Sequence, residues 1–323
     1  MRRRDFITLV GGAAAAWPLA ALAQEAGRTY SLGILAPFPR EEPAASPFFS
    51  ELPRRGFIEG QNLTIDYRDF GPHVDLISEY AAKLVKDRVD VIWGVGGAAM
   101  RATQQATKTI PIFGMADDMV GEGLVDSLAR PNGNTTGLSI FAGELDGKRQ
   151  EILIEGVGGL RRMAALADTN ATTDAKLDVL REAARARNIE LSIHRIAGGG
   201  EIAAAIDTAQ TSGAAALNVL ASPMLFGNRQ LIMDRVAALR LPAIYQWPDT
   251  AEEGGFVAYG PRFAKLYELL AQQAVKLFRG IKVADIPVEQ PTKFELAINL
   301  KTAKALGLTI PESFLQRADK VIQ

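Results

Sequence analysis

Six short loops in this sequence each follow an apolar, strand-like run, and together they carry most of the residues that could bind a ligand. In open parallel sheets, ligands bind beyond the carboxyl ends of the strands, where loops lead into helix N-termini. Function is therefore expected in these loops, which are Ala36-Pro37-Phe38, residues 94–99, Ala116-Asp117-Asp118, Asp168-Thr169-Asn170, Ala221-Ser222-Pro223 and Gln246-Trp247-Pro248.

The second of these loops, Gly94-Val95-Gly96-Gly97-Ala98-Ala99, matches the G-x-G-x-x-A pattern of dinucleotide-binding sites, and Asp117 follows at a distance. The match is weak because the loop follows the third expected strand, and a helix and a strand separate it from Asp117. A second interpretation is that the backbone N–H groups of Gly96, Gly97 and Ala98 hold a carboxylate at a helix start. A third is close packing of small residues, and the sequence leaves all three open.

Asp117 and Asp118 end the next strand-like run, before Val120-Gly121-Glu122-Gly123-Leu124. One of them could face a cleft and pair with the ammonium group of a ligand. The other could cap the helix expected to follow, a role that suits aspartate. If only one of the two is structural, we expect it to be Asp118.

Aromatic side chains lie at or near loop ends in both halves of the chain, where they could form an apolar cage for a ring or an aliphatic chain. They are Phe38, Phe226, Trp247 and Tyr259. Buried core positions are the commoner use of such residues. Trp247 and Tyr259 are the strongest candidates because each ends a strand of the second lobe or of its hinge. Pro37, Asn170 and Pro223 complete the predicted set of ligand-binding residues.

Side chains suited to catalysis or metal binding are scarce. The only two histidines, His73 and His194, have no metal-site spacing, the chain has no cysteine, and no G-x-S-x-G motif occurs. Hydrolysis and metal chemistry are therefore disfavoured. We expect no enzyme, no catalytic residue, no metal and no cofactor.

Strand-like and helix-like periods alternate from residue 29 onward, which predicts βαβ units and parallel sheets. Strands are expected at 30–35, 63–67, 89–93, 110–115 and 134–140, and a second series at 163–167, 191–196, 215–220 and 243–247. Helices of the second series are expected at 173–187, 200–211 and 226–239. The prediction is an α/β fold of two Rossmann-like lobes joined by a hinge, with lobe 1 at 24–140, lobe 2 at 141–261, and 262–323 crossing back to complete both.

Residues 1–23 have the three parts of an export signal, namely a run of arginines, an apolar stretch and small residues at a cleavage site. The apolar stretch is shorter than the ~20 residues that span a bilayer. Arg3-Arg4-Asp5-Phe6-Ile7 fits the twin-arginine pattern of proteins exported folded, with a general secretory signal as the alternative. We expect cleavage after Ala23 and a soluble periplasmic chain without a lipid anchor.

Composition and charge fit a folded, soluble protein. Apolar residues make up 48% of the chain and charged residues 23%, and without residues 1–23 there remain 33 basic and 36 acidic residues. This balance is unlike that of a nucleic-acid-binding or membrane-surface protein.

The chain resembles, from end to end, the ABC transporter substrate-binding proteins, which have the periplasmic binding protein type I fold. The segments that carry the resemblance include Gly60-Gln61-Asn62-Leu63, Gly123-Leu124-Val125, Gly133-Asn134-Thr135-Thr136-Gly137, Tyr259-Gly260, Pro287-Val288-Glu289-Gln290-Pro291-Thr292-Lys293-Phe294-Glu295-Leu296 and Ile298-Asn299-Leu300-Lys301-Thr302-Ala303.

This resemblance implies a monomeric capture protein that closes on one small solute and delivers it to an ABC permease driven by a separate ATPase, without nucleic acid. Some relatives bind aromatic or other amino acids. Asp118-Met119-Val120 stands where the family usually has Asp-Pro-Val, and Asn170-Ala171 where it has Asn-Pro. The identity of the solute therefore cannot be carried over. The alternatives are a periplasmic nicotinamide-dependent oxidoreductase and a solute sensor for a membrane receptor.

Overall fold

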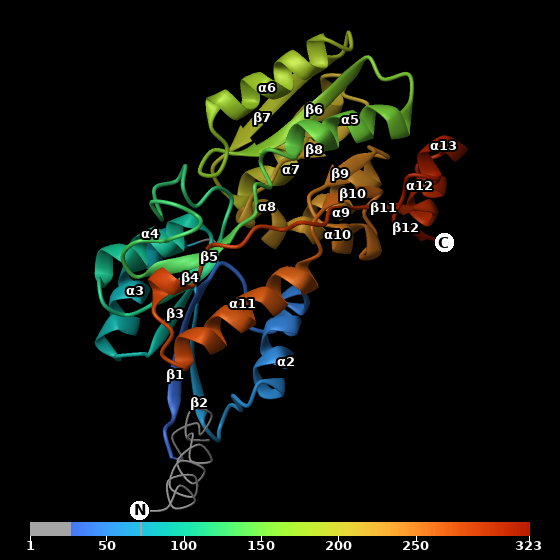
Figure 1. The fold of residues 1–323 in the computed structure, drawn as a ribbon. Helices are drawn as coiled ribbons and strands as arrows, with labels where there is room; N and C mark the ends of the chain where they lie inside the picture. Colours follow the sequence, from blue (N-terminus) through green and yellow to red (C-terminus); the bar gives the residue numbers. More distant parts are fainter. Residues whose placement is uncertain (1–26, 72) are drawn as a thin grey trace, which may run out of the picture.

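The computed structural model describes residues 27–71 and 73–323, and these form two α/β lobes (Figure 1). Each lobe contains a mostly parallel sheet with helices packed on it, so the predicted fold class is confirmed. The predicted export signal, residues 1–23, lies outside the described residues. None of the described helices is long and apolar enough to cross a membrane.

The sheet of the first lobe has five parallel strands in the order β2-β1-β3-β4-β5. The strands are β1 (Tyr30–Ala36), β2 (Leu63–Asp69), β3 (Val91–Val95), β4 (Ile112–Ala116) and β5 (Thr135–Ser139). The helices between them are α2 (Ser46–Arg54), α3 (Ile77–Lys86) and α4 (Gly97–Ala106), with short 3₁₀ turns η2 (Pro43–Ala45) and η3 (Val74–Leu76). Every residue of β3, β4 and β5 is buried, as expected for parallel strands covered on both faces.

The sheet of the second lobe has seven strands in the order β12-β11-β10-β9-β8-β6-β7, and only β11 runs antiparallel to its neighbour β10 among the paired strands. They are β6 (Arg162–Asp168), β7 (Glu190–Ile196), β8 (Leu217–Val219), β9 (Ala243–Tyr245), β10 (Val257–Gly260), β11 (Glu295–Asn299) and β12 (Lys320–Ile322). Its helices are α5 (Asp146–Val157), α6 (Asp174–Arg185), α7 (Ile202–Thr211) with η4 (Gly199–Glu201) before it, α8 (Pro223–Gly227), α9 (Arg229–Ala238), α10 (Pro248–Glu252), α12 (Leu300–Ala305) and α13 (Glu312–Leu315).

The chain passes between the lobes three times. The first crossover, residues 140–145, joins β5 to α5, and the second, residues 261–262, joins β10 to α11 (Phe263–Phe278). Helix α11 lies on the first lobe beside α2 (Figure 1), and the chain then continues through η5 (Val283–Asp285) and returns to β11. On the way, Glu289 forms a parallel bridge with Leu138 of β5, so the returning segment also contacts the first sheet.

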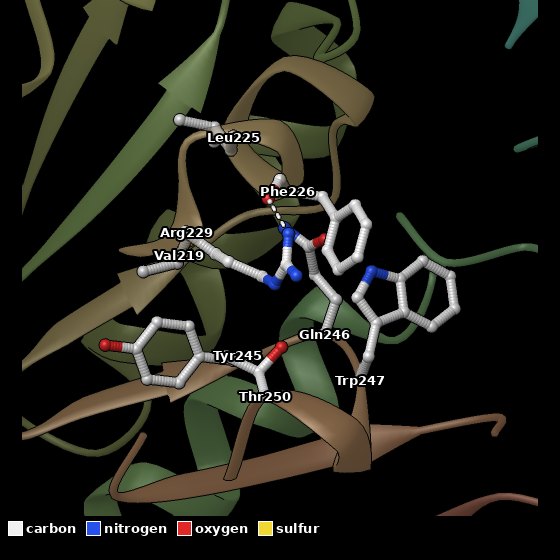
Figure 2. Close-up of a pocket in the computed structure, with 8 residues that line it drawn as sticks. All are labelled: Val219, Leu225, Phe226, Arg229, Tyr245, Gln246, Trp247 and Thr250. Atoms are coloured by element: carbon white, nitrogen blue, oxygen red, sulfur yellow. Dashed lines mark hydrogen bonds between the residues drawn. The ribbon is translucent and has the colours of Figure 1, made fainter. Parts of the chain in front are cut away.

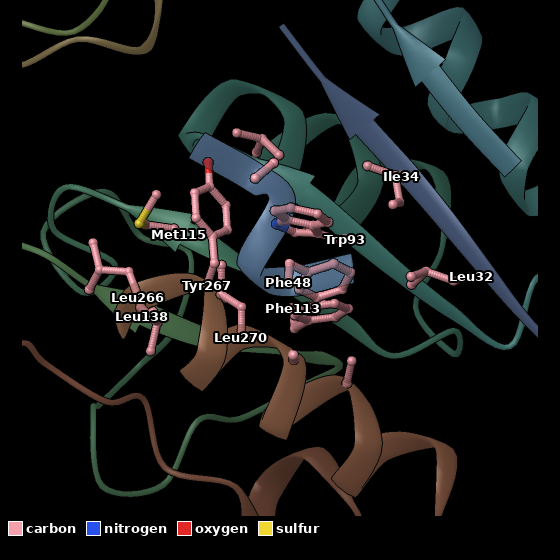
Figure 3. Close-up of a cluster of buried hydrophobic side chains, with 14 of the residues drawn as sticks. Leu32, Ile34, Phe48, Trp93, Phe113, Met115, Leu138, Leu266, Tyr267 and Leu270 are labelled. Carbon is pink, nitrogen blue, oxygen red and sulfur yellow. The ribbon is translucent and has the colours of Figure 1, made fainter. Parts of the chain in front are cut away.

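Helix α11 completes the core of the first lobe with its apolar face (Figure 3). Its Tyr267 contacts the ring of Trp93 edge-on at a centroid distance of 5.8 Å, and Phe48 from α2 lies 4.3 Å from the same ring. Leu266, Leu270 and Ala274 are buried in the same cluster. Because these side chains come from the terminal part of the chain, the first lobe cannot complete its core without it.

Two features of the second lobe differ from the sequence-based prediction. One helix was expected at 226–239, but the structure has two. Helix α8 begins at Pro223, where Ser222 caps it, and helical structure is interrupted at Asn228 before α9 begins. Helix α5 was not predicted. It buries Asp146, Arg149 and Gln150, and these inward polar residues conceal the apolar period by which a helix is identified.

Candidate functional site

Two rows of loops meet where the lobes face each other. In the first lobe, the adjacent strands β1, β3 and β4 end at Pro37-Phe38, Gly96 and Asp117. In the second lobe, the adjacent strands β9, β8 and β6 end at Gln246-Trp247, Ser222-Pro223 and the loop to α6. The contacts described below pair these loops in order, so the interface has a charged end, a glycine–proline middle and an aromatic end.

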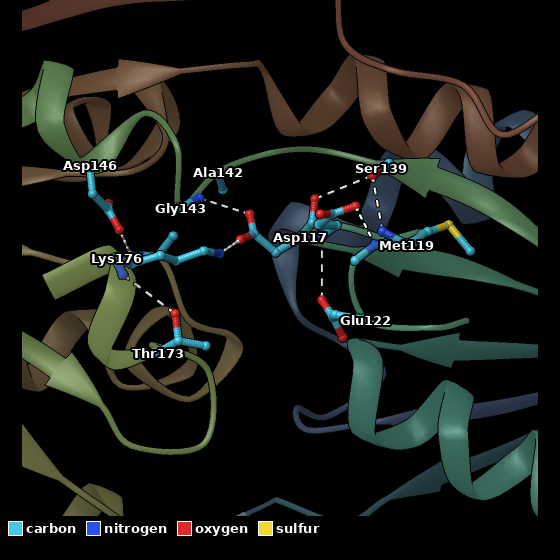
Figure 4. Close-up of polar contacts among 12 residues, drawn as sticks. Asp117, Met119, Glu122, Ser139, Ala142, Gly143, Asp146, Thr173 and Lys176 are labelled. Atoms are coloured by element: carbon cyan, nitrogen blue, oxygen red, sulfur yellow. Dashed lines mark hydrogen bonds and ion pairs between the residues drawn. The ribbon is translucent and has the colours of Figure 1, made fainter. Parts of the chain in front are cut away.

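At the charged end, Asp117 of the first lobe forms an ion pair with Lys176 of the second lobe (Figure 4). The other carboxylate oxygen of Asp117 accepts a hydrogen bond of 2.7 Å from the backbone N–H of Gly143, in the first crossover. The two charged side chains are only partly exposed, Lys176 at 32% and Asp117 at 23%. Asp117 therefore connects the second lobe, the first lobe and the hinge.

Lys176 is placed by the start of α6, where the Thr173 hydroxyl caps the helix by accepting from the Lys176 N–H at 3.4 Å. Burial opposes the charged form of its ammonium group. The hydrogen bond and charge of Asp117, with smaller contributions from Asp146 and Glu122, outweigh that burial and raise the pKa of Lys176. The lysine is thus firmly cationic at this end of the interface.

Asp118 has a local, structural role. Its carboxylate accepts hydrogen bonds from the N–H groups of Val120 at 3.2 Å and Gly121 at 2.9 Å, which closes the turn after β4. One of the two aspartates was expected to cap a helix after β4. The structure has a turn at this place and no helix, and Asp118 caps that turn. Asp117 is the aspartate that faces the opposite lobe.

In the middle of the interface, Gly96 lies against Pro223. Gly96 caps α4 with φ 85° and ψ 159°, a conformation that is essentially restricted to glycine. A Cβ atom at Gly96 would lie 3.3 Å from Cγ of Pro223 in the other lobe. The sequence pattern of glycines here therefore reflects backbone conformation and close approach between the lobes.

The first turn of α4 is already occupied by a carboxylate of the protein. A Cβ atom built on Gly97 would lie 1.9 Å from Oε2 of Glu122, which also pairs with Arg101 at 3.3 Å. An anionic group at a helix N-terminus is favourable. A second anion, such as the diphosphate of a dinucleotide, would meet this negative charge, and Ala98 beside it is exposed.

At the aromatic end, rings from both lobes form one buried cluster. Trp247 lies 4.2 Å and Phe226 4.5 Å from the ring of Phe263 at the start of α11, measured between ring centroids. Phe38 belongs to the same cluster, and its carbonyl accepts a 2.8 Å hydrogen bond from the Tyr67 hydroxyl. Three of the four predicted aromatic residues are thus brought together.

A second ion pair crosses the lobes beside these rings. Arg229 of α9 contacts Glu42 of the first lobe at 2.7 Å and Glu253 of its own lobe at 2.6 Å. Its guanidinium carbon lies 4.3 Å from the centroid of the Phe226 ring. Glu253 therefore helps to fix the position of the Arg229 side chain.

A small cavity, with room for about one water molecule, lies between Arg229, Gln246 and Trp247 (Figure 2). The Trp247 indole N–H is buried beside it and has no hydrogen-bond partner among the described residues. All the residues that line this cavity belong to the second lobe, and the cavity is too small to hold an amino acid.

The remaining predicted residues lie apart from this cluster or play other roles. Tyr259 is in β10, with its ring 6.3 Å from that of Phe294 in the third crossover. Asn170 is exposed, and its side-chain amide donates to the Ala197 carbonyl at 3.4 Å. Pro37 lies near Gly227 of the opposite lobe, its carbonyl oxygen 4.0 Å from a Cβ built there.

Sequence reasoning did not identify Lys176, Arg229, Glu42 or Glu122. One signal was available for Lys176, because a lysine in the first turn of a helix is unfavourable for the helix dipole and so requires a partner. The partners of Arg229 and Glu42 are distant in the chain and only the fold brings them together. In the described part of the chain, no three histidine or acidic side chains are grouped to hold a metal ion.

Comparisons with known proteins identify the family of this chain. The family model of the ABC transporter substrate binding proteins matches residues 45–322. A tyrosine-binding protein of Clostridioides difficile (strain R20291) is 28% identical over 285 residues, which are 86% of this chain and 81% of that protein.

Two solved structures show the same fold. An ABC domain in complex with L-Trp from Streptococcus pneumoniae has a TM-score of 0.78 at 21% identity, covering 91% of this chain and 100% of that one. The ligand-free, open structure of a substrate-binding protein with adhesive properties from Clostridium difficile has a TM-score of 0.61 at 23% identity, with the same coverage.

The two lobes and their mostly parallel sheets have the periplasmic binding protein type I fold. The chain belongs to the ABC transporter substrate-binding family, which confirms the resemblance found in its motifs. Its function is that of an ABC substrate-binding protein, and the oxidoreductase alternative is not favoured.

Proposed function

We propose that this protein captures an amino acid with an aromatic side chain between its lobes and delivers it to an ABC permease. The observation that carries the proposal is the polarity of the interface, which is charged at Asp117 and Lys176 and aromatic at Phe38, Phe226 and Trp247. The two ends are two strand positions apart in each sheet, which corresponds to about 10 Å. That separation suits a molecule with a zwitterion at one end and a ring at the other.

The charged end offers one group of each sign, and each comes from a different lobe. The ammonium group of an amino acid would bind Asp117, and its carboxylate would bind Lys176, so the direct pair is replaced by two charge-assisted hydrogen bonds. A solute held in this way contacts both lobes at once. Without it, the two side chains neutralise each other, as they do in the structure.

The aromatic end would hold the ring. Offset or edge-to-face contacts between aromatic rings add about 0.5–1.5 kcal/mol to the effect of burial. Because Phe226 and Trp247 belong to the second lobe and Phe38 to the first, a ring placed between them would also bridge the lobes. The tyrosine named for the relative and the L-Trp named for the solved complex are solutes of this chemical class.

Capture requires the lobes to open and close. We take residues 24–140 and 141–261 as the moving units, with 262–323 contributing to both. Opening would separate Asp117 from Lys176 and Glu42 from Arg229, and it would expose the aromatic rings. A solute that contacts both lobes shifts the population toward the closed form in proportion to its extra affinity for that form.

We further propose that residues 1–23 direct export by the twin-arginine route and are cleaved after Ala23, so that a soluble monomer acts in the periplasm. The protein would perform no covalent chemistry, and the permease would recognise its closed form. The amino-terminal start of α4, where a dinucleotide would bind, carries the Glu122 carboxylate, which favours capture over cofactor chemistry.

A thermal-shift screen of residues 24–323 tests the proposal, with amino acids, aromatic acids, sugars and nucleotides as ligands. A ligand present at about 100 times its Kd adds about 2.7 kcal/mol to the free energy of unfolding. We expect shifts with L-tyrosine or L-tryptophan and none with sugars. A shift with nicotinamide dinucleotides alone would overturn the proposal in favour of an enzyme.

A further inference from the structure

A buried ion pair lies at the hinge, outside the interface described above. Arg149 and Asp146 are one turn apart on α5, and their exposed fractions are 0% and 3%. Nη1 of Arg149 lies 2.6 Å from Oδ1 of Asp146. Both side chains are buried, in contrast to the partly exposed Asp117 and Lys176 of the charged end.

Arg149 binds backbone carbonyls from three separate segments. Its Nη1 donates to Ala142 in the first crossover at 2.7 Å, and its Nε donates to Tyr259, just before the second crossover, at 2.8 Å. Its Nη2 donates to Gln246, beside Trp247, at 3.5 Å. One side chain thus joins two crossovers to the loop that carries an aromatic residue of the interface.

Asp146 joins a fourth segment to the same centre. Its carboxylate accepts from the backbone N–H of Ala221 at 3.3 and 3.4 Å, in the loop that leads to Pro223. The backbone carbonyl of Asp146 also accepts from the side-chain amide of Asn218 at 3.1 Å. The middle and aromatic loops of the second lobe are therefore both fixed to this ion pair.

The backbone around the pair is constrained at both crossovers. Phe141, next to Ala142, has a φ of 45°, which is uncommon for a bulky residue. At Gly260, a Cβ atom would lie 2.0 Å from the carbonyl oxygen of Gln246 and 3.6 Å from Nη2 of Arg149. The first crossover thus has an uncommon backbone conformation at Phe141, and the backbone just before the second crossover packs closely against Gln246.

Stability alone does not explain this arrangement. Burial disfavours the charged form of both side chains, raising the pKa of Asp146 and lowering that of Arg149. Replacing a buried ion pair by apolar residues of similar volume is often neutral or stabilising. The multidentate contacts, in contrast, need the planar fork of an arginine.

The pair is also connected to the charged end of the interface (Figure 4). Gly143 donates its N–H to Asp117, and the preceding residue, Ala142, is held by Arg149. A continuous series of contacts therefore runs from Lys176 through Asp117 and the first crossover to Arg149. Asp117 and Lys176 are the groups that a solute would engage.

We propose that Arg149 and Asp146 are positioning residues for solute capture, which hold Ala142, the end of β10 and the 221 and 246 loops as one rigid unit. The lobes then bend in the parts of the crossovers outside this unit, at residues 140–141 and 261–262, and reach a single closed arrangement with both loops in place. This inference rests on the proposed function, because it concerns the closure that captures the solute.

The test measures the distance between the lobes. The chain has no cysteine, so Val74→Cys and Val179→Cys, at exposed positions in opposite lobes, can carry spin labels without background labelling. Distance distributions are recorded for the ligand-free protein by double electron–electron resonance. They are compared for the labelled parent, Arg149→Lys and Arg149→Met, with Arg235→Met as the control, since Arg235 pairs with Asp207 between two helices and touches no crossover.

We expect a narrow distribution for the parent and for Arg235→Met, and a broader or multiple distribution for both Arg149 variants. Arg149→Lys is decisive because it keeps a charge for Asp146 but cannot reach the Ala142 and Tyr259 carbonyls together. If Arg149→Lys folds with a distribution as narrow as that of the parent, the proposal is wrong.

Titration with L-tyrosine and L-tryptophan separates this inference from the proposed function. A parent that does not respond to either amino acid contradicts the proposed function, whereas the ligand-free distributions still test the positioning role. Where the parent binds, Arg149→Lys should weaken the apparent affinity by roughly 2- to 30-fold. Unchanged affinity with an unchanged distribution would contradict both the coupling and the positioning role.

Discussion

Replacing Asp117 by asparagine removes one charge from the interface and little else. The Asn Oδ1 can still accept the hydrogen bond from Gly143, which is 2.7 Å in the structure. A hydrogen bond to a charged group contributes about 1.5–3 kcal/mol. Loss of the partly exposed pair with Lys176, worth about 0–1 kcal/mol in the ligand-free protein, offsets part of this. The expected net loss of affinity is therefore about 0.5–3 kcal/mol, or roughly 2- to 150-fold.

The assay is isothermal titration with L-tyrosine and L-tryptophan and with their analogues that lack the amino group. The loss on Asp117→Asn should appear for the amino acids and disappear for the analogues, because only the amino acids have an ammonium group. Asp118→Asn is the matched control, since Asp118 only closes the turn at Val120 and Gly121. The reasoning is refuted if Asp118→Asn loses as much affinity, or if the loss does not depend on the amino group.

Three further substitutions test other parts of the account. Gly96→Ala should lower the free energy of unfolding by about 1–3 kcal/mol because the backbone conformation at Gly96 is unfavourable for alanine. The added methyl group would also press on Pro223 and favour the open form, which would appear as a lower apparent affinity for the solute and a more open solution-scattering profile. An unchanged affinity would argue against the contact with Pro223. Trp247→Ala should lower the free energy of unfolding by about 3–5 kcal/mol and Trp247→Phe by less than about 1.5 kcal/mol, as measured by chemical denaturation. Equal losses of stability in the two variants would show that the ring is not packed as described. Burial raises the pKa of Asp146 to about 6, against about 3.9 for an unfolded chain, so the folded protein binds an extra proton between these values. The free energy of unfolding therefore falls as the pH rises from about 4 through 6, and the wild type should lose about 2 kcal/mol relative to Asp146→Asn between pH 4 and 7. Parallel pH profiles for the two proteins would exclude this titration.

The alternation of strands and helices in the sequence predicts the two lobes because each strand and each amphipathic helix has its own period. Helix α11, for example, shows a regular apolar period, with Phe263, Leu266 and Leu270 all buried. Helix α5 was missed, since its inward face carries Asp146, Arg149 and Gln150 in place of apolar residues. Local patterns fail where a helix buries polar groups whose partners lie far away in the chain.

The candidate site was predicted in its loops but not in its pairings. Phe38, Gly96, Asp117, Pro223 and Trp247 all lie at the interface, because the ends of adjacent parallel strands must meet at one edge. Which residues face each other depends on how the lobes meet, and no local pattern contains that information. The partner of Asp117 is accordingly a lysine 59 positions away.

The most direct test of the central claim is a crystal structure of residues 24–323 with L-tyrosine or L-tryptophan. The account predicts that the amino nitrogen lies within hydrogen-bond distance of the Asp117 carboxylate, the solute carboxylate contacts Lys176, and the ring lies among Phe38, Phe226 and Trp247. A solute bound elsewhere, with the Asp117–Lys176 pair intact, would contradict it.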